Sequence, residues 1–358
     1  MRHPRPAPAR TRSTARSLAV CLVAGLTSVA GTAVAHADTH VRCGTAALNA
    51  AIVKANAAGK GTIVLARHCV YDFKTPYTGQ DATPAITVPI TFVGNGAVLR
   101  RDPGSAAHFR LLDVAVGGTA VLRDLTVEKG DVTGDGGGIL VQRGGTLRAK
   151  SVTVKDNTAA GDGGGIDDRG TVELKASRLA GNTAALFGGG LAVESGGTAA
   201  VTGTKIYDNG ARSFFGGGVL NDGSVTIEDS SVTHNHVDAG DGGGLWNDSQ
   251  MTVNGSTIAD NAARDHGGGV TNAGGGKATF NGSTIKNNSA GRQAGGVYNV
   301  NPGSTLVLNL SRVTRNTAGG PPGGVFNGPG STVVNKHSVI KDNIPTNCSP
   351  SVVPGCVG

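Results

Sequence analysis

Charged side chains capable of acid–base chemistry gather in the middle of the sequence, in short segments between an asparagine and a run of glycines. The catalytic candidates are Asp238, Asp241, Arg264, Asp265 and His266. If a sugar chain is hydrolysed, Asp238 or Asp241 would work with Asp265, at the roughly 5–5.5 Å separation of retaining enzymes. If it is cleaved by β-elimination, His236, His266 or an arginine would abstract the proton while a cation neutralises the adjacent carboxylate.

Other side chains in these segments are of the types that bind an acidic sugar. Arginines pair with carboxylates, and aromatic rings contact the faces of sugar rings. The expected substrate-binding residues are Arg212, Phe214, Phe215, His236 and Arg292. Asp238, Asp241 and Asp265 can also hold Ca²⁺, which prefers oxygen ligands. The competing interpretation is that these polar residues are solvated or form surface ion pairs of little energy.

The same segments belong to a repeat of 25–28 residues. An aliphatic residue follows a glycine pair or triplet at Ile139, Ile166, Leu191, Val219, Leu245, Val270, Val297 and Val325. An asparagine recurs at positions 157, 182, 209, 235, 261, 288, 316 and 343, with an aliphatic residue three positions earlier. Serine or threonine stands five positions before the asparagine in all units but the first. A period in the twenties predicts a solenoid.

The pattern inside each unit predicts strands. Short alternating apolar runs such as residues 225–227 are broken by glycine and asparagine, and no apolar stripe of helical period occurs. We therefore expect an all-β, single-domain, right-handed parallel β-helix with about three strands per coil and a short N-terminal capping helix. The glycines would permit close backbone approach, and the asparagines would sit at a left-handed corner with their amides hydrogen-bonded along the stack.

A second polar row follows the aliphatic residues by two positions, at Asp168, Asn221, Asn247, Asn272, Asn299 and Asn327. We expect this row to form another corner rather than a site. Trp246, the only tryptophan, would be a platform for a sugar ring if exposed and a packing residue if covered.

The chain divides into four parts. Residues 1–37 carry five arginines, an apolar stretch and Ala35-His36-Ala37, which is typical of a secretory signal peptide, with a membrane anchor as the alternative. Residues 38–130 are expected to form a cap and irregular coils, starting with a helix capped by Thr45. Residues 131–343 hold the regular repeats. Residues 344–358 form a C-terminal cap whose prolines would block edge pairing.

Removal of residues 1–37 has two consequences. Loss of the five arginines lowers the formal net charge from +7 to +2, which leaves no argument for nucleic-acid binding. Four cysteines remain, and only local pairing keeps both bridges within a terminal region, so we favour Cys43–Cys69 and Cys348–Cys356. An exported chain permits disulfides, and no C-x-x-C spacing supports a metal site.

Residues 86–99 (ITVPITFVGNGAVL) resemble an early coil of the pectin-lyase-like right-handed β-helix superfamily. The repeated Gly-Gly-x-aliphatic and aliphatic-x-x-Asn patterns are similar to polymorphic outer-membrane protein repeats. The first resemblance implies the β-helix fold and the polysaccharide cleavage of pectate lyases and polygalacturonases, and the second implies adhesion and surface display. The sequence lacks the Trp-Ile-Asp-His motif of pectate lyases and the Asn-Thr-Asp motif of polygalacturonases, so no catalytic residue is carried over.

The expected protein is a secreted, extracellular monomer with no membrane span after residue 37. It would bind, and on the catalytic interpretation cleave, extracellular acidic polysaccharide, with Ca²⁺ as the candidate cofactor. The alternative is a non-catalytic surface or adhesion module whose ligand is a protein or another cell-surface component. A lyase would release unsaturated products, whereas a binding module would retain its ligand without creating new chain ends.

Overall fold

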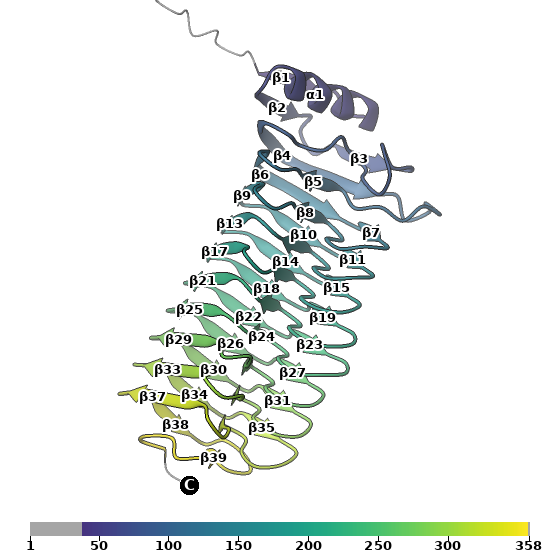
Figure 1. Cartoon of the computed structure of the whole chain (residues 1–358). Coiled ribbons are helices and arrows are strands. Elements are labelled where there is room, and N and C mark those ends of the chain that lie inside the picture. Colours follow the sequence, from purple (N-terminus) through teal and green to yellow (C-terminus); the bar gives the residue numbers. More distant parts are fainter. Residues whose placement is uncertain (1–37, 357–358) are drawn as a thin grey trace, which may run out of the picture. The chain divides into compact units, whose positions relative to one another are not determined.

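Short runs of alternating apolar and polar residues form strands. Each strand pairs in parallel with the strand one repeat further along the chain. The computed structural model describes residues 38–356, which form a right-handed parallel β-helix with one short helix (Figure 1). The signal-peptide prediction for residues 1–37 lies outside the described residues. No helix in residues 38–356 is long and apolar enough to cross a membrane.

The largest sheet has 21 strands and is bent along its length. One side of the bend holds β1 (Thr39–Val41), β2 (Gly61–Leu65), β4 (Pro89–Arg101), β6 (Thr119–Glu128), β9 (Thr146–Lys150), β13 (Thr171–Lys175), β17 (Thr198–Thr202), β21 (Ser224–Glu228), β25 (Gln250–Asn254), β29 (Lys277–Asn281), β33 (Thr305–Asn309) and β37 (Thr332–Lys336). The other side holds β3 (Val70–Phe73), β10 (Thr153–Lys155), β14 (Arg178–Ala180), β18 (Lys205–Tyr207), β22 (Ser231–Thr233), β26 (Thr257–Ala259), β30 (Thr284–Lys286), β34 (Arg312–Thr314) and β38 (Val339–Lys341). The long strands β4 and β6 cross the bend and join the two sides.

Two further sheets complete each coil. The eight-stranded sheet holds β7 (Asp131–Val132), β11 (Thr158–Ala159), β15 (Thr183–Ala184), β19 (Gly210–Ala211), β23 (His236–Val237), β27 (Ala262–Ala263), β31 (Ser289–Ala290) and β35 (Thr317–Ala318). The ten-stranded sheet holds β5 (Leu112–Val114), β8 (Ile139–Val141), β12 (Ile166–Asp168), β16 (Leu191–Val193), β20 (Val219–Asn221), β24 (Leu245–Asn247), β28 (Val270–Asn272), β32 (Val297–Asn299), β36 (Val325–Asn327) and β39 (Cys348–Pro350). A regular coil thus has four strands in three sheets, because the bend in the largest sheet divides one run into two strands.

The predicted aliphatic rows form the core. The residues after the glycines, from Ile139 to Val325, and those three positions before the asparagines, from Val154 to Ile340, are buried. Equivalent residues of successive coils lie directly above one another, as Val219 and Leu245 do. Stacking therefore joins faces that a single repeat cannot bury into one continuous core.

The asparagine row is buried and hydrogen-bonded along the stack, as expected. The Asn209 side chain donates to Oδ1 of Asn235 (2.9 Å), and the Asn235 side chain donates to Oδ1 of Asn261 (3.0 Å). The left-handed backbone conformation predicted for the asparagines occurs instead one residue earlier in the chain. It belongs to the exposed residue before each asparagine, for example His234 (φ 56°) and Asp260 (φ 57°). That residue can point its side chain to solvent, whereas the asparagine must turn its amide inward to reach the next coil.

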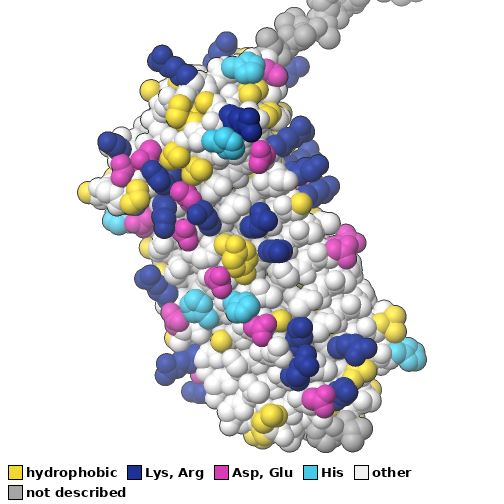
Figure 2. Space-filling view, turned by 180° about the vertical axis from the view of Figure 1, so that it is seen from behind, with side chains coloured by type: hydrophobic (Ala, Val, Ile, Leu, Met, Phe, Trp, Pro, Cys, Tyr) yellow, Lys and Arg dark blue, Asp and Glu magenta, His cyan; other side chains and the backbone are white. Residues whose placement is uncertain are grey.

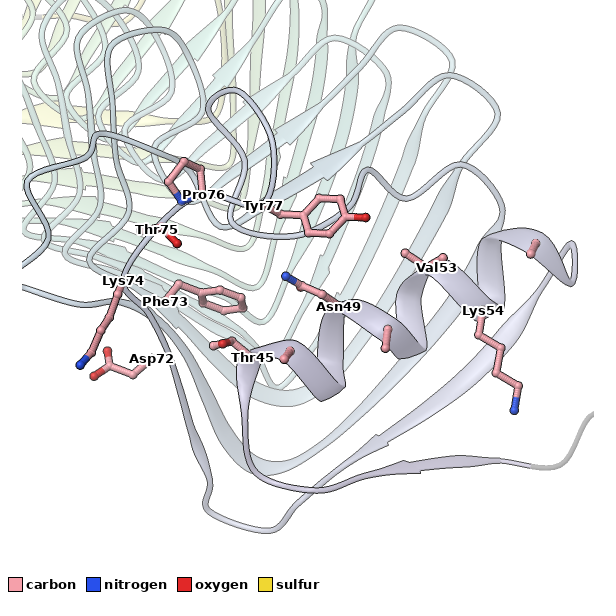
Figure 3. A pocket seen from close by; sticks show the side chains of 13 residues that line it. Thr45, Asn49, Val53, Lys54, Asp72, Phe73, Lys74, Thr75, Pro76 and Tyr77 are labelled. Atoms are coloured by element: carbon pink, nitrogen blue, oxygen red, sulfur yellow. The ribbon is translucent and has the colours of Figure 1, made fainter.

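The helix α1 (Thr45–Ala57) covers the first coil and contacts β1 to β4. Leu48, Ala51, Ile52 and Ala55 form its buried side, as predicted. The predicted cap is wrong: Gly44 is the N-cap residue, Thr45 lies inside the helix, and no side chain caps the N-terminus. The opposite side of α1 borders a cavity of about 940 Å³, and Val53 and Tyr77 are among its lining residues (Figure 3).

The C-terminal segment closes the other end of the stack. β39 adds a parallel strand to β36 and is the last strand of its sheet, and it ends at Pro350. That the prolines block pairing at this edge stays a prediction. Val353 is buried against the core. Both expected disulfides, Cys43–Cys69 and Cys348–Cys356, are present.

Candidate functional site

The ten-stranded sheet has an outer face, which we define as the side turned away from the core. The central residue of each strand points to this face because its two neighbours point inward. In coil order the central residues include Leu140, Asp167, Ala192, Leu220, Trp246, Thr271, Tyr298 and Phe326. The six of these from Leu140 to Thr271 are nevertheless buried. Three of them, Ala192, Leu220 and Trp246, belong to a second, smaller cluster that Phe187 and Phe215, from the segments before the glycines, help to cover.

Aromatic rings from these two rows stack on one another. Phe215 lies against Trp246, with ring centroids 3.7 Å apart and planes inclined by 11°. Phe187 contacts Phe215 (5.6 Å) and stacks on Phe214 (5.1 Å), which is 43 % exposed. Hydrophobic side chains also gather midway along the space-filling view, with acidic, basic and histidine side chains close by (Figure 2). Part of this aromatic cluster is therefore available to a ligand.

Carboxylates form a third row, at the residue that follows each of the three successive strands β16, β20 and β24. Glu194, Asp222 and Asp248 occupy equivalent positions in successive coils, since each backbone N–H donates to the strand of the preceding coil. These three carboxylates line a cavity of about 200 Å³ together with Asp162, Phe187, Phe215, Leu220 and Trp246. We call it the acidic cavity.

Burial is the main reason why the carboxyl groups around the cavity have raised pKa values. Burial, helped by the charges of Glu194 and Asp135, raises the pKa of Asp162 to about 7. It also raises the pKa of Asp222 to about 6, with Asp248 adding repulsion. Beneath the cavity, burial raises the pKa of Asp167 to about 8 although Arg169 opposes the shift. Strongly shifted carboxyl groups beside a cavity are typical of functional sites.

Several polar atoms around the cavity are buried without a hydrogen bond in the described structure. They are Oε1 of Glu194, Oδ1 of Asp222, Oδ1 of Asp248, both carboxylate oxygens of Asp167 and the indole Nε1 of Trp246. Asp167 has a charge partner, since Nε of Arg169 lies 2.9 Å from its Oδ2. The Trp246 N–H lowers the pKa of Asp248 by its proximity, yet it completes no hydrogen bond. Buried unpaired polar groups cost about 1–3 kcal/mol each, so a ligand that pairs them would gain affinity.

Four of the predicted site residues lie together next to this cavity. Asp241 pairs with Phe215 from the equivalent position of the next coil. Its Oδ1 accepts a hydrogen bond from the backbone N–H of His266 (2.7 Å). Burial raises the pKa of Asp241 to about 6, and burial lowers that of His266, whose ring stacks on Tyr298 (4.5 Å). Nε of Arg292 pairs with Oδ1 of Asp265 at 3.0 Å.

Two further predicted residues belong to the aromatic cluster: Phe215 lines the cavity, and Phe214 stacks beside it. The other predicted residues lie in exposed loop segments. His236 and Asp238 are exposed, with Nε2 and Oδ1 3.8 Å apart, and Arg212 and Arg264 are also exposed. Within residues 38–356, no group of three or more His, Cys, Asp or Glu side chains is placed to hold a metal ion. Asp238, Asp241 and Asp265 therefore do not form a preassembled calcium site, and the calcium prediction remains a prediction.

Sequence reasoning missed the carboxylates of the acidic cavity as site residues. Asp167 carries a usable signal, because it interrupts a strand-centre row that is otherwise mostly apolar or aromatic. Asp222 and Asp248 stand beside the second asparagine row, which is a buried corner as expected: Asn221 donates to Oδ1 of Asn247 at 2.6 Å. Trp246 is 7 % exposed, so the covered alternative holds for its ring.

Comparison with known proteins agrees with the fold. Residues 119–317, more than half of the chain, match the family model described as the right-handed beta helix region. None of the curated proteins matches the chain. Among solved structures, the chain is similar to the A-module of a mannuronan C-5 epimerase from Azotobacter vinelandii, at 18 % identity and a TM-score of 0.34, covering 86 % of this chain and 96 % of that chain.

Proposed function

The chain belongs to the right-handed β-helix family, and we propose that it binds a polysaccharide along the outer face of the ten-stranded sheet. The observation that carries the proposal is the acidic cavity, in which the rings of Phe187, Phe215 and Trp246 face a row of carboxylates. Concave sites with aromatic walls and a few converging polar groups are the usual form of small-molecule sites.

The chemistry of the lining suits a sugar. Aromatic rings offer flat apolar surface to the C–H face of a pyranose, while its hydroxyl groups can donate to the unpaired oxygens of Glu194, Asp222 and Asp248. Rows of side chains repeat from coil to coil at about 4.8 Å. A polymer with repeating units can therefore contact the cavity with one unit and the Asp241–His266 segment with a neighbouring unit.

The same carboxylates support a second step, cleavage of the bound chain. A carboxyl group with a raised pKa is protonated near neutral pH and can donate a proton to a leaving oxygen, while an ionised one acts as nucleophile or base. Asp162 suits the acid role because its pKa is about 7. Asp222 and Asp248 stand one coil apart, and either suits the second role.

Trp246 makes binding measurable without a label. It is the only tryptophan of the sequence and lines the cavity. A saccharide that enters should shift its fluorescence, and Phe215→Ala should weaken binding by up to about tenfold, because one aromatic contact is worth about 0.5–1.5 kcal/mol. Tyr77→Ala, an exposed aromatic residue beside the N-terminal helix, is the matched control and should leave affinity unchanged. The proposal fails if no member of a panel of acidic, neutral and amino polysaccharides alters the fluorescence of folded protein.

Cleavage is tested separately, by following reducing ends and unsaturated products with and without Ca²⁺. Asp162→Asn should abolish turnover of a polysaccharide that the variant still binds, and so should one of the two variants Asp222→Asn and Asp248→Asn. Binding without any new chain ends across the panel would leave a non-catalytic binding module.

A second candidate function is favoured by a different surface, the basic face. We define it by Arg178, Lys205, Lys286 and Arg312, which project from β14, β18, β30 and β34. None of these four cations has an ion-pair partner within residues 38–356. They line two cavities of about 330 and 320 Å³ that also contain serine and threonine side chains.

Such a surface suits an acidic polysaccharide better than the acidic cavity does, because its charge attracts carboxylates. On this proposal the chain is a surface module that holds an acidic polymer. Lys205→Gln with Arg312→Gln should weaken retention on a polyuronate column several-fold and reduce its dependence on salt. Lys150→Gln with Lys277→Gln is the charge-matched control. Equal retention of both double variants would contradict the role of the basic face.

A further inference from the structure

We infer that the acidic cavity selects a sugar that carries a free amino group, in preference to a neutral or a uronic-acid sugar. This inference rests on the polysaccharide proposal above and names the substrate class of the same site. It departs from the acidic polysaccharide expected from the sequence.

The charge of the lining is the first argument. Four of the eight lining residues are acids, and none is a lysine, arginine or histidine. Two more acids, Asp135 and Asp167, lie close by and share the cation Arg169 between them. A uronate brought into this cavity would be repelled by the carboxylates that are ionised, whereas an ammonium group would be attracted by them.

The unpaired atoms are the second argument. Asp222 and Asp248, one coil apart, each present one buried oxygen without a hydrogen bond, whereas the Asp167 carboxyl contacts Glu194. An ammonium group carries three N–H donors and no acceptor, so it can donate to both of these oxygens at once. The buried Trp246 N–H, which also lacks a partner, remains free to donate to a hydroxyl or ring oxygen of the same sugar. A hydroxyl group has a single donor and could satisfy only one of the two oxygens.

A metal ion fits the cavity less well than an organic cation. No three carboxylates within residues 38–356 are close enough to share one metal ion. Ca²⁺ needs six to eight oxygen ligands at about 2.3–2.6 Å, whereas an ammonium group is satisfied by two or three acceptors at about 2.7–2.9 Å. The rings of Phe215 and Trp246 add a favourable surface, because aromatic faces attract a desolvated cation.

The volume limits what enters. About 200 Å³ is less than the roughly 300–1,000 Å³ of sites for drug-sized ligands. The cavity therefore admits one ring or one protruding group of a longer chain. Neighbouring units would lie outside it, along the exposed ring of Phe214 and the Asp241–His266 segment.

The test compares three oligosaccharides of equal length on the unmodified chain. They are a glucosamine oligomer, its N-acetylated counterpart and an oligouronate, each titrated by calorimetry and by Trp246 fluorescence near neutral pH. We expect the glucosamine oligomer to bind at least about tenfold more tightly than the acetylated one, and the oligouronate to leave the fluorescence unchanged. The comparison needs no variant, so a folding defect cannot obscure it.

Variants then locate the preference. Asp222→Asn and Asp248→Asn should bring the two glucosamine-type oligomers to similar affinity, while the acetylated oligomer still binds. Asp260→Asn removes the same charge at an exposed corner and should keep the full preference.

The outcomes separate this inference from the polysaccharide proposal. Equal binding of the amino and acetylated oligomers would overturn the inference and leave the proposal standing. Displacement of the glucosamine oligomer by an equally tight polylysine would also overturn it, because the cavity would then recognise charge alone. Failure of every saccharide to bind folded protein would overturn both.

Discussion

Single side chains hold the coils in register, and the asparagine row is the clearest case. Oδ1 of Asn235 accepts from the backbone N–H (3.0 Å) and the side-chain amide (2.9 Å) of Asn209. Its own amide donates to Asn261 and to the carbonyl of Ile206 (3.0 Å). Because all these groups are buried, removal of one side chain leaves donors of the adjacent coil without acceptors.

Asn235→Ala should therefore lower the free energy of unfolding by about 3 kcal/mol, since two buried donors lose their partner at about 1–3 kcal/mol each. The free energy is measured by urea denaturation. Asn254→Ala is the control, because that half-buried amide makes one side-chain contact, with Asn281, and should cost less than about 1 kcal/mol. Equal losses of unfolding free energy in the two variants would show that the buried asparagine row stabilises the chain no more than a half-buried surface contact.

The carboxylates under the outer face give stability a particular pH dependence. Asp167 has a pKa of about 8 in the folded chain, against about 3.9 unfolded. A raised pKa means that the folded state binds the proton more tightly. The contribution of Asp167 is therefore complete below about pH 4 and is lost as the pH rises through about 8.

We expect the melting temperature of the chain to fall between about pH 5 and about pH 9. In Asp167→Asn the fall should be smaller, because the amide does not ionise. The Asp162 carboxyl shifts in the same direction, so part of the fall should remain. An identical fall in both proteins would contradict the assignment of Asp167 as a protonated, buried acid.

At the scale of elements, the glycines have two separate roles. A Cβ added to Gly243 would meet the backbone of Ala262 and lie 2.6 Å from the carbonyl oxygen of Gly268. Gly282 instead lies at a corner with φ +57° and has no atom within 4 Å of an added Cβ. The equivalent corner is occupied by Ala176 and Leu310 in other coils.

Gly243→Ala should accordingly destabilise the chain by about 3 kcal/mol or more, because backbone rather than a movable side chain must shift. Gly282→Ala should cost only about 1–2 kcal/mol, the price of a left-handed conformation for an L-residue. Thermal unfolding of the two variants measures the difference. A larger loss in Gly282→Ala would place the constraint in backbone conformation instead of close packing.

The elements were predictable because stacking repeats each requirement in every coil. Spacing alone identified the aliphatic columns, both polar rows and both disulfides. The conformation of the asparagines was misassigned because residue type favours the left-handed region there, while the hydrogen-bonded row requires the amide to face inward. The acidic cavity was not predictable, since Asp167 and Trp246 occupy positions where the repeat varies and their burial depends on rings contributed by another segment.

At the scale of the whole described chain, each coil contacts only its neighbours, so stability should vary along the stack. Asn235 lies in the middle, with regular coils on both sides. Asn343 lies in the last coil, where its amide donates to Oδ1 of Asn347 (3.0 Å) and its Oδ1 accepts from Asn316 (2.9 Å). Replacing the asparagine by alanine should therefore destabilise coils on both sides of Asn235, but only the last coils at Asn343.

Hydrogen exchange read by mass spectrometry distinguishes these cases. In Asn343→Ala, faster exchange should be confined to the coils from about residue 312 onward, because the end can open without disturbing the coils before it. In Asn235→Ala, exchange should rise on both sides of the substituted coil, since opening there exposes two coil surfaces. If instead Asn343→Ala accelerates exchange evenly through β9 to β38, the coils unfold as one cooperative unit and nearest-neighbour stacking does not govern the stability of this chain.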